Sequence, residues 1–221
     1  MGNEDKVVAL AGATGLVGGL CLRELLGRQT VQKVVVLGRR APTVTDARLQ
    51  MRKVDFAALP PPQPNEQINA ALCALGTTIK DAGSQEAFRA VDQHAVVAFA
   101  TWARAHNCRT FVLVSSVGAS AKAGSFYLRV KGETEAAVCT LGFDRVVILR
   151  PGVLLGKRAH LRPGEAVAQA VLPIAGRLLL GSWDRFRAID AGVVAKAMAK
   201  ASLAVEPGTF VWHNRDILAY A

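Results

Sequence analysis

The chain has 221 residues, of which 51% are hydrophobic and 20% charged, and this composition excludes an intrinsically disordered or fibrous protein. Its uncharged apolar stretches, such as 95–103 and 166–176, are too short for a membrane helix, which needs about 18 to 20 residues. The 27 basic and 17 acidic residues give a formal net charge of +10, which makes an anionic partner worth testing.

The amino-terminal residues and the cysteines bear on location and metal binding. Residues 1–6 are polar and carry charges of both signs, unlike the basic and then apolar start of a secretory signal, so we expect a cytoplasmic protein. The four cysteines are scattered, with no partner at metal-ligand spacing, so we expect neither a disulfide framework nor a metal site. One domain over 1–221 suits this length.

Short apolar runs rich in β-branched residues predict strands that are buried on both faces of a parallel sheet. These runs are 6–11, 33–37, 71–75, 110–115 and 145–149, with weaker candidates at 49–54 and 209–212. Helical patterns lie between the strands, at 15–27, 84–106, 126–141 and 190–204. Strands that alternate with helices indicate right-handed βαβ units. We therefore predict an α/β fold with a doubly wound parallel sheet in a single domain.

Three glycines follow the first predicted strand, in the sequence Gly12-Ala-Thr-Gly15-Leu-Val-Gly18. Gly12 would permit a tight turn, Gly15 would let the backbone approach a diphosphate, and Gly18 would let helix and strand pack closely. The free N–H groups at the start of the helix favour a phosphate there. The alternative is a glycine-rich turn without a ligand. The candidate dinucleotide-binding residues are Gly12, Thr14, Gly15, Leu16, Val17 and Gly18.

The end of the second predicted strand bears on the choice of dinucleotide. A chain that selects NAD places Asp or Glu there, whereas this chain has Arg39 and Arg40. Two guanidinium groups suit the 2′-phosphate of NADP, so NADP is favoured; the alternative is that both are solvated surface side chains. Asp55, after the third strand candidate, could accept a hydrogen bond from the adenine amino group or cap the next turn.

A tyrosine, a lysine and a serine form the candidate catalytic group. Tyr127 and Lys131 lie four residues apart near the start of a predicted helix, so they share one face. Ser115 and Ser116 end the preceding predicted strand, and the side chains would converge where a nicotinamide would lie. The alternative is structural: a tyrosine packed on the sheet, a solvated lysine and a serine pair that ends a strand.

Longer strings around these residues resemble a known family. With its glycine loop, serine, tyrosine and lysine in order, the chain resembles the short-chain dehydrogenases/reductases of the atypical or extended kind. The strings 73–78 (CALGTT), 113–118 (LVSSVG), 126–133 (FYLRVKGE) and 149–155 (LRPGVLL) are similar to the Tat-interactive-protein-like oxidoreductases, which are related to NmrA-like proteins. This resemblance implies a Rossmann fold with about seven strands, NADP as cofactor and a substrate that is often unidentified.

The resemblance also implies roles for individual residues. Tyr127 would protonate a carbonyl oxygen as hydride arrives, or act as the base in the reverse direction. Since a free phenol has a pKa of about 10, Lys131 and the oxidised nicotinamide would have to lower it. Lys131 would also hold the nicotinamide ribose, and Ser116 would donate a hydrogen bond to the substrate oxygen. By position, the cofactor would be lined by Leu75, Gly76, Thr77 and the stretch 151–154, which includes Pro151 and Val153.

Residues 151–189 break the alternation of strands and helices, so we expect them to cover the carboxyl edge of the sheet, where ligands bind. Trp183 is a candidate pocket wall there, or packs within the loop. Seven cations against two anions lie between 150 and 187, which predicts an anionic substrate. The cations are Arg150, Lys157, Arg158, Arg162, Arg177, Arg185 and Arg187, and the anions are Glu165 and Asp184.

We interpret the chain as an NADP(H)-dependent oxidoreductase that acts on a carbonyl compound or a sugar-nucleotide-like small molecule. The alternative is an NADPH-binding regulatory or sensor protein with little or no turnover. Nucleic acid is a disfavoured partner, because the other cations are dispersed and no nucleic-acid-binding motif occurs. The resemblance also implies a homodimer through the helices at 84–106 and 126–141.

Overall fold

The computed structural model describes residues 6–62, 66–156 and 185–221, and its centre is a seven-stranded sheet in which all neighbouring strands are parallel. The predicted doubly wound sheet is thereby confirmed. Its order is β3-β2-β1-β4-β5-β6-β9. The strands are β1 (Lys6–Ala11), β2 (Val31–Gly38), β3 (Leu49–Lys53), β4 (Ala70–Cys73), β5 (Thr110–Val114), β6 (Arg145–Leu149) and β9 (Gly208–Trp212).

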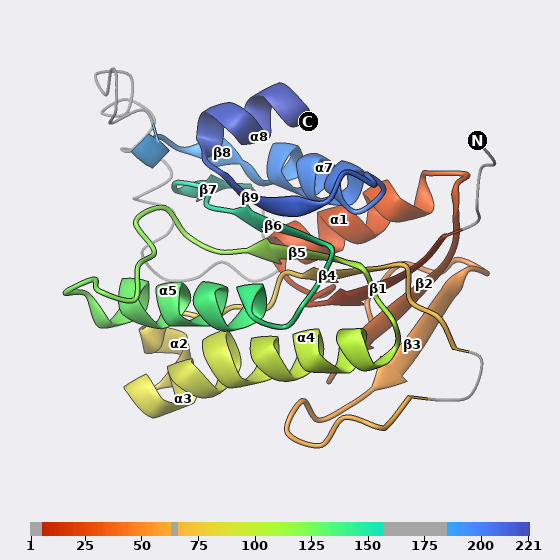
Figure 1. The fold of residues 1–221 in the computed structure, drawn as a ribbon, viewed down its shortest axis with the longest axis horizontal. Helices are drawn as coiled ribbons and strands as arrows, with labels where there is room; N and C mark the ends of the chain where they lie inside the picture. Colours follow the sequence, from red (N-terminus) through yellow and green to blue (C-terminus); the bar gives the residue numbers. More distant parts are fainter. Residues whose placement is uncertain (1–5, 63–65, 157–184) are drawn as a thin grey trace.

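Helices cover both faces of this sheet (Figure 1). One face carries α1 (Leu16–Leu26), α7 (Ala191–Ala201) and α8 (Asn214–Tyr220). The other face carries α4 (Val96–Ala105) and α5 (Phe126–Cys139). The short helices α2 (Ile79–Ala82) and α3 (Gln85–Arg89) lead into α4. The result is the three-layer α/β arrangement that a buried parallel sheet requires.

The side chains of β1 show why its sequence is apolar at nearly every position. Val8 and Leu10 belong to the hydrophobic cluster under α1 and α7, whereas Ala9 and Ala11 belong to the cluster under α4. All four are completely buried. Because successive residues of a strand point to opposite faces, a strand covered on both sides needs apolar residues without interruption.

The strand order places a topological switch point between β1 and β4. From β1 the chain continues to β2 and β3 on one side, and from β4 it continues to β5, β6 and β9 on the other side. The loops after β1 and β4 therefore part in opposite directions and leave a crevice at the carboxyl edge of the sheet. Ligands bind at such a crevice in open α/β sheets.

The helix predicted over 84–106 is divided into three parts. Between α3 and α4 lies a π-helical turn, η1 (Ala90–Ala95), which takes up one more residue than an α-helical turn. The prediction missed this turn because it treated the apolar positions of 84–106 as one continuous helical pattern. The turn shifts the helix register at Asp92, which proves important for the site.

The expected substrate-side segment, 151–189, is described at its two ends. There β7 (Leu154–Leu155) and β8 (Ile189–Asp190) pair in a small parallel sheet. Residues 157–184, including Trp183 and four of the seven cations, lie outside the described residues. Within the three described ranges, no helix is long and apolar enough to cross a membrane.

Candidate functional site

The glycine loop connects β1 to α1 at the switch point. Gly12 has a φ of 88°, a conformation that favours glycine, and Gly15 N–H donates to the Gly12 carbonyl at 3.0 Å. A Cβ on Gly12 would lie 2.5 Å from the backbone carbon of Ala74, which follows β4. A Cβ on Gly18 would lie 2.1 Å from the Gly12 oxygen. The glycines therefore bring the loop, the helix and β4 into close contact.

The N-terminus of α1 faces this loop with free backbone groups. Gly15 occupies the N-cap, and within the described structure neither a capping side-chain bond nor an acidic residue in the first turn satisfies the helix start. The first N–H groups of a helix and its positive dipole end attract an anion. This arrangement fits the diphosphate of a dinucleotide, which would be held by the backbone of Gly15, Leu16 and Val17.

The residues predicted to select the dinucleotide lie at the ends of β2 and β3. Arg39 and Arg40 follow β2 and are exposed, and no carboxylate takes their place. Asp55 follows β3, and its Oδ1 accepts a hydrogen bond of 3.0 Å from the Ala57 N–H, which is the capping contact that the sequence left as an alternative. A role of Asp55 with adenine stays a prediction.

A cleft of about 300 Å³ opens at the switch point. It brings together eleven of the predicted site residues, which come from the glycine loop and from the ends of β4, β5, α5 and β6. They are Gly15, Leu16, Val17, Leu75, Gly76, Thr77, Ser116, Tyr127, Lys131, Pro151 and Val153. Gly12, Thr14, Gly18, Arg39, Arg40 and Asp55 are not among its lining residues. The cleft thus joins the phosphate loop to the candidate catalytic group.

Tyr127 lies in the first turn of α5 and is partly buried. Its ring packs on the fully buried ring of Phe88 from α3, with centroids 5.4 Å apart. Such an aromatic contact restricts the ring and leaves the hydroxyl end available for a partner. Packing on Phe88 therefore holds the Tyr127 ring where Tyr127 lines the cleft.

Lys131 lies one turn further along α5 and is almost completely buried. Its Nζ is 2.8 Å from Oδ1 of Asp92, a residue of η1 with no exposed surface. The other oxygen of Asp92 accepts a hydrogen bond of 2.8 Å from the Thr77 N–H. Burial alone would lower the pKa of Lys131, but Asp92 and then Tyr127 hold it above its usual value, so Lys131 is a cation.

The two serines at the end of β5 have different surroundings. The Ser115 hydroxyl donates to Oε1 of Glu135 on α5, and Arg150 pairs with the same carboxylate, Nε lying 3.1 Å from Oε1. The Ser116 hydroxyl makes a long contact of 3.4 Å to the Val117 carbonyl, and Ser116 is partly exposed. Ser116 is therefore the serine that could donate to a ligand, and Arg150 is already neutralised by Glu135.

Sequence reasoning missed several residues of this cleft. Ala74, Thr78 and Val114 also line it, as does Asp92. Most are neighbours of predicted residues and could have been added by position. Asp92 had a weaker signal, since it is an acidic residue within an otherwise apolar helical pattern. A buried charge in such a pattern usually has a charged partner.

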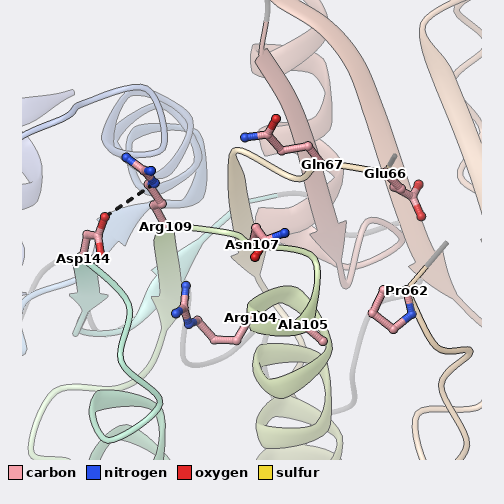
Figure 2. A pocket seen from close by; sticks show the side chains of 8 residues that line it. All are labelled: Pro62, Glu66, Gln67, Arg104, Ala105, Asn107, Arg109 and Asp144. Atoms are coloured by element: carbon pink, nitrogen blue, oxygen red, sulfur yellow. Dashed lines mark ion pairs between the residues drawn. The ribbon is translucent and has the colours of Figure 1, made fainter. Parts of the chain in front are cut away.

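A larger hollow of about 930 Å³ lies at the opposite, amino edge of the sheet and is open and polar (Figure 2). Arg109 and Asp144, which precede β5 and β6, form an exposed ion pair of 3.8 Å across part of it. Arg104 Nε donates to the Leu141 carbonyl at 3.2 Å. These charged side chains thus bond to one another or to backbone carbonyls. The candidate catalytic residues that the sequence predicts line the smaller cleft instead.

Comparisons with known proteins agree with this geometry. A family model described as NAD(P)H-binding matches residues 12–169. The chain is 38% identical over 199 residues to Protein HTATIP2 of Rattus norvegicus, a match that covers 88% of this chain and 80% of that protein. It is 33% identical over 228 residues to the mitochondrial protein fmp52 of Aspergillus niger, covering 96% of this chain and 97% of that protein.

Solved structures share the fold at low sequence identity. The Bordetella bronchiseptica enzyme WbmH in complex with NAD+ has a TM-score of 0.67 and 18% identity, over 95% of this chain and 76% of that chain. UDP-N-acetylglucosamine 4-epimerase from Methanobrevibacter ruminantium M1, in complex with UDP-N-acetylmuramic acid, has a TM-score of 0.70 and 16% identity, over 95% and 77%. At these identities the likeness concerns the fold alone.

Proposed function

The chain belongs to the NAD(P)H-binding family, among the atypical short-chain dehydrogenases/reductases, and we propose that it is an NADP(H)-dependent oxidoreductase that acts on a carbonyl compound. One observation carries this proposal: part of the glycine loop lines the same cleft at the switch point as Ser116, Tyr127 and Lys131, through Gly15, Leu16 and Val17. A phosphate site and a proton donor in one cleft are what hydride transfer to a carbonyl group requires.

The residues of the cleft have distinct tasks in this proposal. A reduced nicotinamide, on a dinucleotide held by the backbone of Gly15, Leu16 and Val17, would supply hydride to the carbonyl carbon. Tyr127 donates its hydroxyl proton to the carbonyl oxygen and recovers a proton from solvent, so that the carbonyl becomes an alcohol. Ser116 donates a hydrogen bond to the same oxygen as negative charge develops there. Lys131 holds the nicotinamide ribose.

The preference for NADP rests on the end of β2. Arg39 and Arg40 are exposed where the adenosine ribose of a dinucleotide would lie, and a 2′-phosphate there would meet two cations. NAD carries a hydroxyl instead, for which the chain offers no carboxylate at that strand end. We therefore propose NADP(H) rather than NAD(H).

The substrate is proposed as a carbonyl compound or a sugar-nucleotide-like molecule. An anionic substrate has less support from the described residues than the charge count suggested, because Arg150 is paired with Glu135. Of the seven cations, Arg185 and Arg187 are also described, and the other four lie outside the described residues. The anionic class therefore stays a prediction, and so does a cytoplasmic location.

Turnover of NADPH with matched carbonyl panels tests the proposal. One panel holds aldehydes and ketones that carry a carboxylate or phosphate, and the other holds their neutral analogues. We expect NADPH oxidation with at least one panel and faster turnover with the anionic one. Tight NADPH binding with no turnover on either panel would contradict the proposed oxidoreductase activity and favour the regulatory alternative.

A further inference from the structure

Asp92 is buried and is held at both carboxylate oxygens and at its backbone carbonyl. Lys131 Nζ and the Thr77 N–H approach its two oxygens, and the Thr134 hydroxyl on α5 donates to its backbone carbonyl at 3.0 Å. Above the ion pair lies Gly76, where a Cβ would be 3.4 Å from Asp92 Oδ1 and 3.6 Å from Lys131 Nζ. The pair is therefore fixed in place and covered by a glycine in the cleft.

Of the residues that the structure describes, three titratable groups act on Lys131 at close range. They are Asp92 from η1, Tyr127 from α5 and Cys73 from β4. Burial raises the pKa of the Cys73 thiol to about 12, so this group is neutral at pH 7. Within the described part of the chain, the charge beside Tyr127 is therefore the sum of one ammonium and one carboxylate, which is zero.

The charged side chains on the neighbouring turns of α5 have partners outside the cleft. Glu133 pairs with Arg89, and Glu135 pairs with Arg150. Arg129 donates to the Ala123 carbonyl at 3.0 Å and lies over the Phe126 ring. None of these side chains lines the cleft, so among the described residues the Asp92–Lys131 pair determines the charge closest to Tyr127.

We propose that Asp92 is a positioning residue that neutralises Lys131 and thereby keeps Tyr127 protonated until an oxidised cofactor is present. A lone ammonium near a phenol favours the phenolate by roughly one to three pH units, and an anion at ion-pair distance from that ammonium cancels most of this effect. A protonated Tyr127 is a proton donor. The site is thus prepared for reduction of a carbonyl with neutral NADPH bound, and this inference of direction rests on the proposed function.

The chain permits a direct test, because it has two tyrosines, Tyr127 and Tyr220. Tyr220 packs on Trp212 with centroids 4.3 Å apart, and Phe keeps that ring contact. In a Tyr220→Phe background, the phenolate signal of the full chain reports on Tyr127 alone. It can be titrated without any cofactor, by ultraviolet difference absorbance or by NMR of ring-labelled tyrosine.

Three variants in this background make the test sharp. Asp92→Asn leaves Lys131 unbalanced while an amide oxygen still accepts from Thr77, so the titration midpoint of Tyr127 should fall by about one pH unit or more. Lys131→Met should raise it. The double variant Asp92→Asn/Lys131→Met replaces a neutral ion pair by a neutral pair, and its midpoint should lie within about half a pH unit of the background.

The double variant also keeps the test decisive if Asp92→Asn fails to fold. If Asp92 did not neutralise Lys131, the double variant would lose an active cation and titrate about one unit or more above the background, which would overturn the inference. An unchanged midpoint in folded Asp92→Asn would overturn it as well. Glu206→Gln, an exposed carboxylate at the amino edge of the sheet, is the control and should change nothing. Because no cofactor is present, failure of NADPH binding would refute the proposed function without affecting this readout.

Discussion

Tyr127 is the residue whose removal tests the proposed chemistry most simply. Tyr127→Phe keeps the ring contact with Phe88 but removes the proton donor. We expect turnover of NADPH with a carbonyl substrate to fall by about 100-fold or more, while the dissociation constant for NADPH changes little. Steady-state kinetics and calorimetry measure the two effects.

Tyr220→Phe is the matched control for that variant, because Tyr220 lies in α8 against Trp212 and is not among the residues of the cleft. It should retain the parent turnover. Equal activity of Tyr127→Phe and the parent would show that another group supplies the proton.

The predicted preference for NADP(H) over NAD(H) rests on Arg39 and Arg40. Charge-assisted hydrogen bonds are worth roughly 1.5 to 3 kcal/mol, less where solvent and salt screen them, as at these exposed positions. In the variant Arg39→Ala/Arg40→Ala, NADPH affinity should fall about tenfold or more at low salt, and NADH affinity should stay the same. Arg23→Ala, which removes an exposed cation from α1, is the control. An equal loss for both dinucleotides would contradict a 2′-phosphate contact.

The spacing of Tyr127 and Lys131 was enough to predict that they share a face, because a separation of four residues places two side chains on one side of a helix whatever the tertiary structure. Ser116 was added because it follows a predicted strand of the same sheet. The partner of Lys131 could not be predicted in this way. Asp92 lies 39 positions earlier in the chain and meets Lys131 through packing of η1 on α5. The hydrogen bond from the Ser115 hydroxyl to Glu135 also joins two elements that are distant in the chain, so it could not be predicted from spacing.

Helix α5 requires a glycine where it crosses the loop after β5. A Cβ on Gly132 would lie 2.2 Å from the Ser120 backbone carbon and 2.3 Å from the Ala121 nitrogen, so the backbone would have to move. Overpacking of this kind costs about 1 to 3 kcal/mol, and we expect Gly132→Ala to lower the melting temperature by about 4 °C or more.

Gly27→Ala is the control for that variant. Its Cβ would meet the Arg23 oxygen at 3.4 Å, an ordinary contact, and the position has a helical φ of −72°. The two melting temperatures should differ clearly. If Gly132→Ala melted with the control, the close crossing of α5 over this loop would be wrong.

The connection into β4 predicts a pH dependence of stability. Arg52 on β3, and to a smaller extent the imidazole of His106, hold the pKa of Glu66 below its usual value. A carboxyl with a lowered pKa stabilises the fold above the pKa that it has in the unfolded chain, about 4.3, and this stabilisation is lost as the pH falls through the lower value.

Glu66→Gln should therefore be less stable than the parent at neutral pH and approach it in acid. Denaturant unfolding between pH 7 and acid, about pH 3, measures this difference, with the exposed carboxylate variant Glu86→Gln as the control. A difference that stays constant over this range would show that the Glu66 charge does not contribute.

Long apolar strands and helices were predictable because their patterns repeat over many residues, as in β2 and α5. The elements α2, α8, β7 and β8, each of two to seven residues, were missed because so few positions define no period. The interrupted helix α3-η1-α4 shows the same limit: the π-helical turn spans only six residues, and Asp92 within it lines the cleft.

The arrangement of the whole molecule follows from the alternation of strands and helices, which predicted the parallel sheet, its helices on both faces and the binding crevice at its carboxyl edge. The order of strands supplied what the pattern could not, namely that the crevice opens between β1 and β4. A homodimer through the helices of 84–106 and 126–141 stays a prediction. Sedimentation of the full chain would show whether its mass is twice 23.4 kDa.

The central claim is that the cleft at the switch point binds NADPH through the glycine loop. Calorimetric titration of the full chain with NADPH and with NADH tests it directly. We expect one NADPH per chain, bound at least about tenfold more tightly than NADH, a difference of about 1.4 kcal/mol. Absence of binding for both dinucleotides at saturating concentration would contradict the claim.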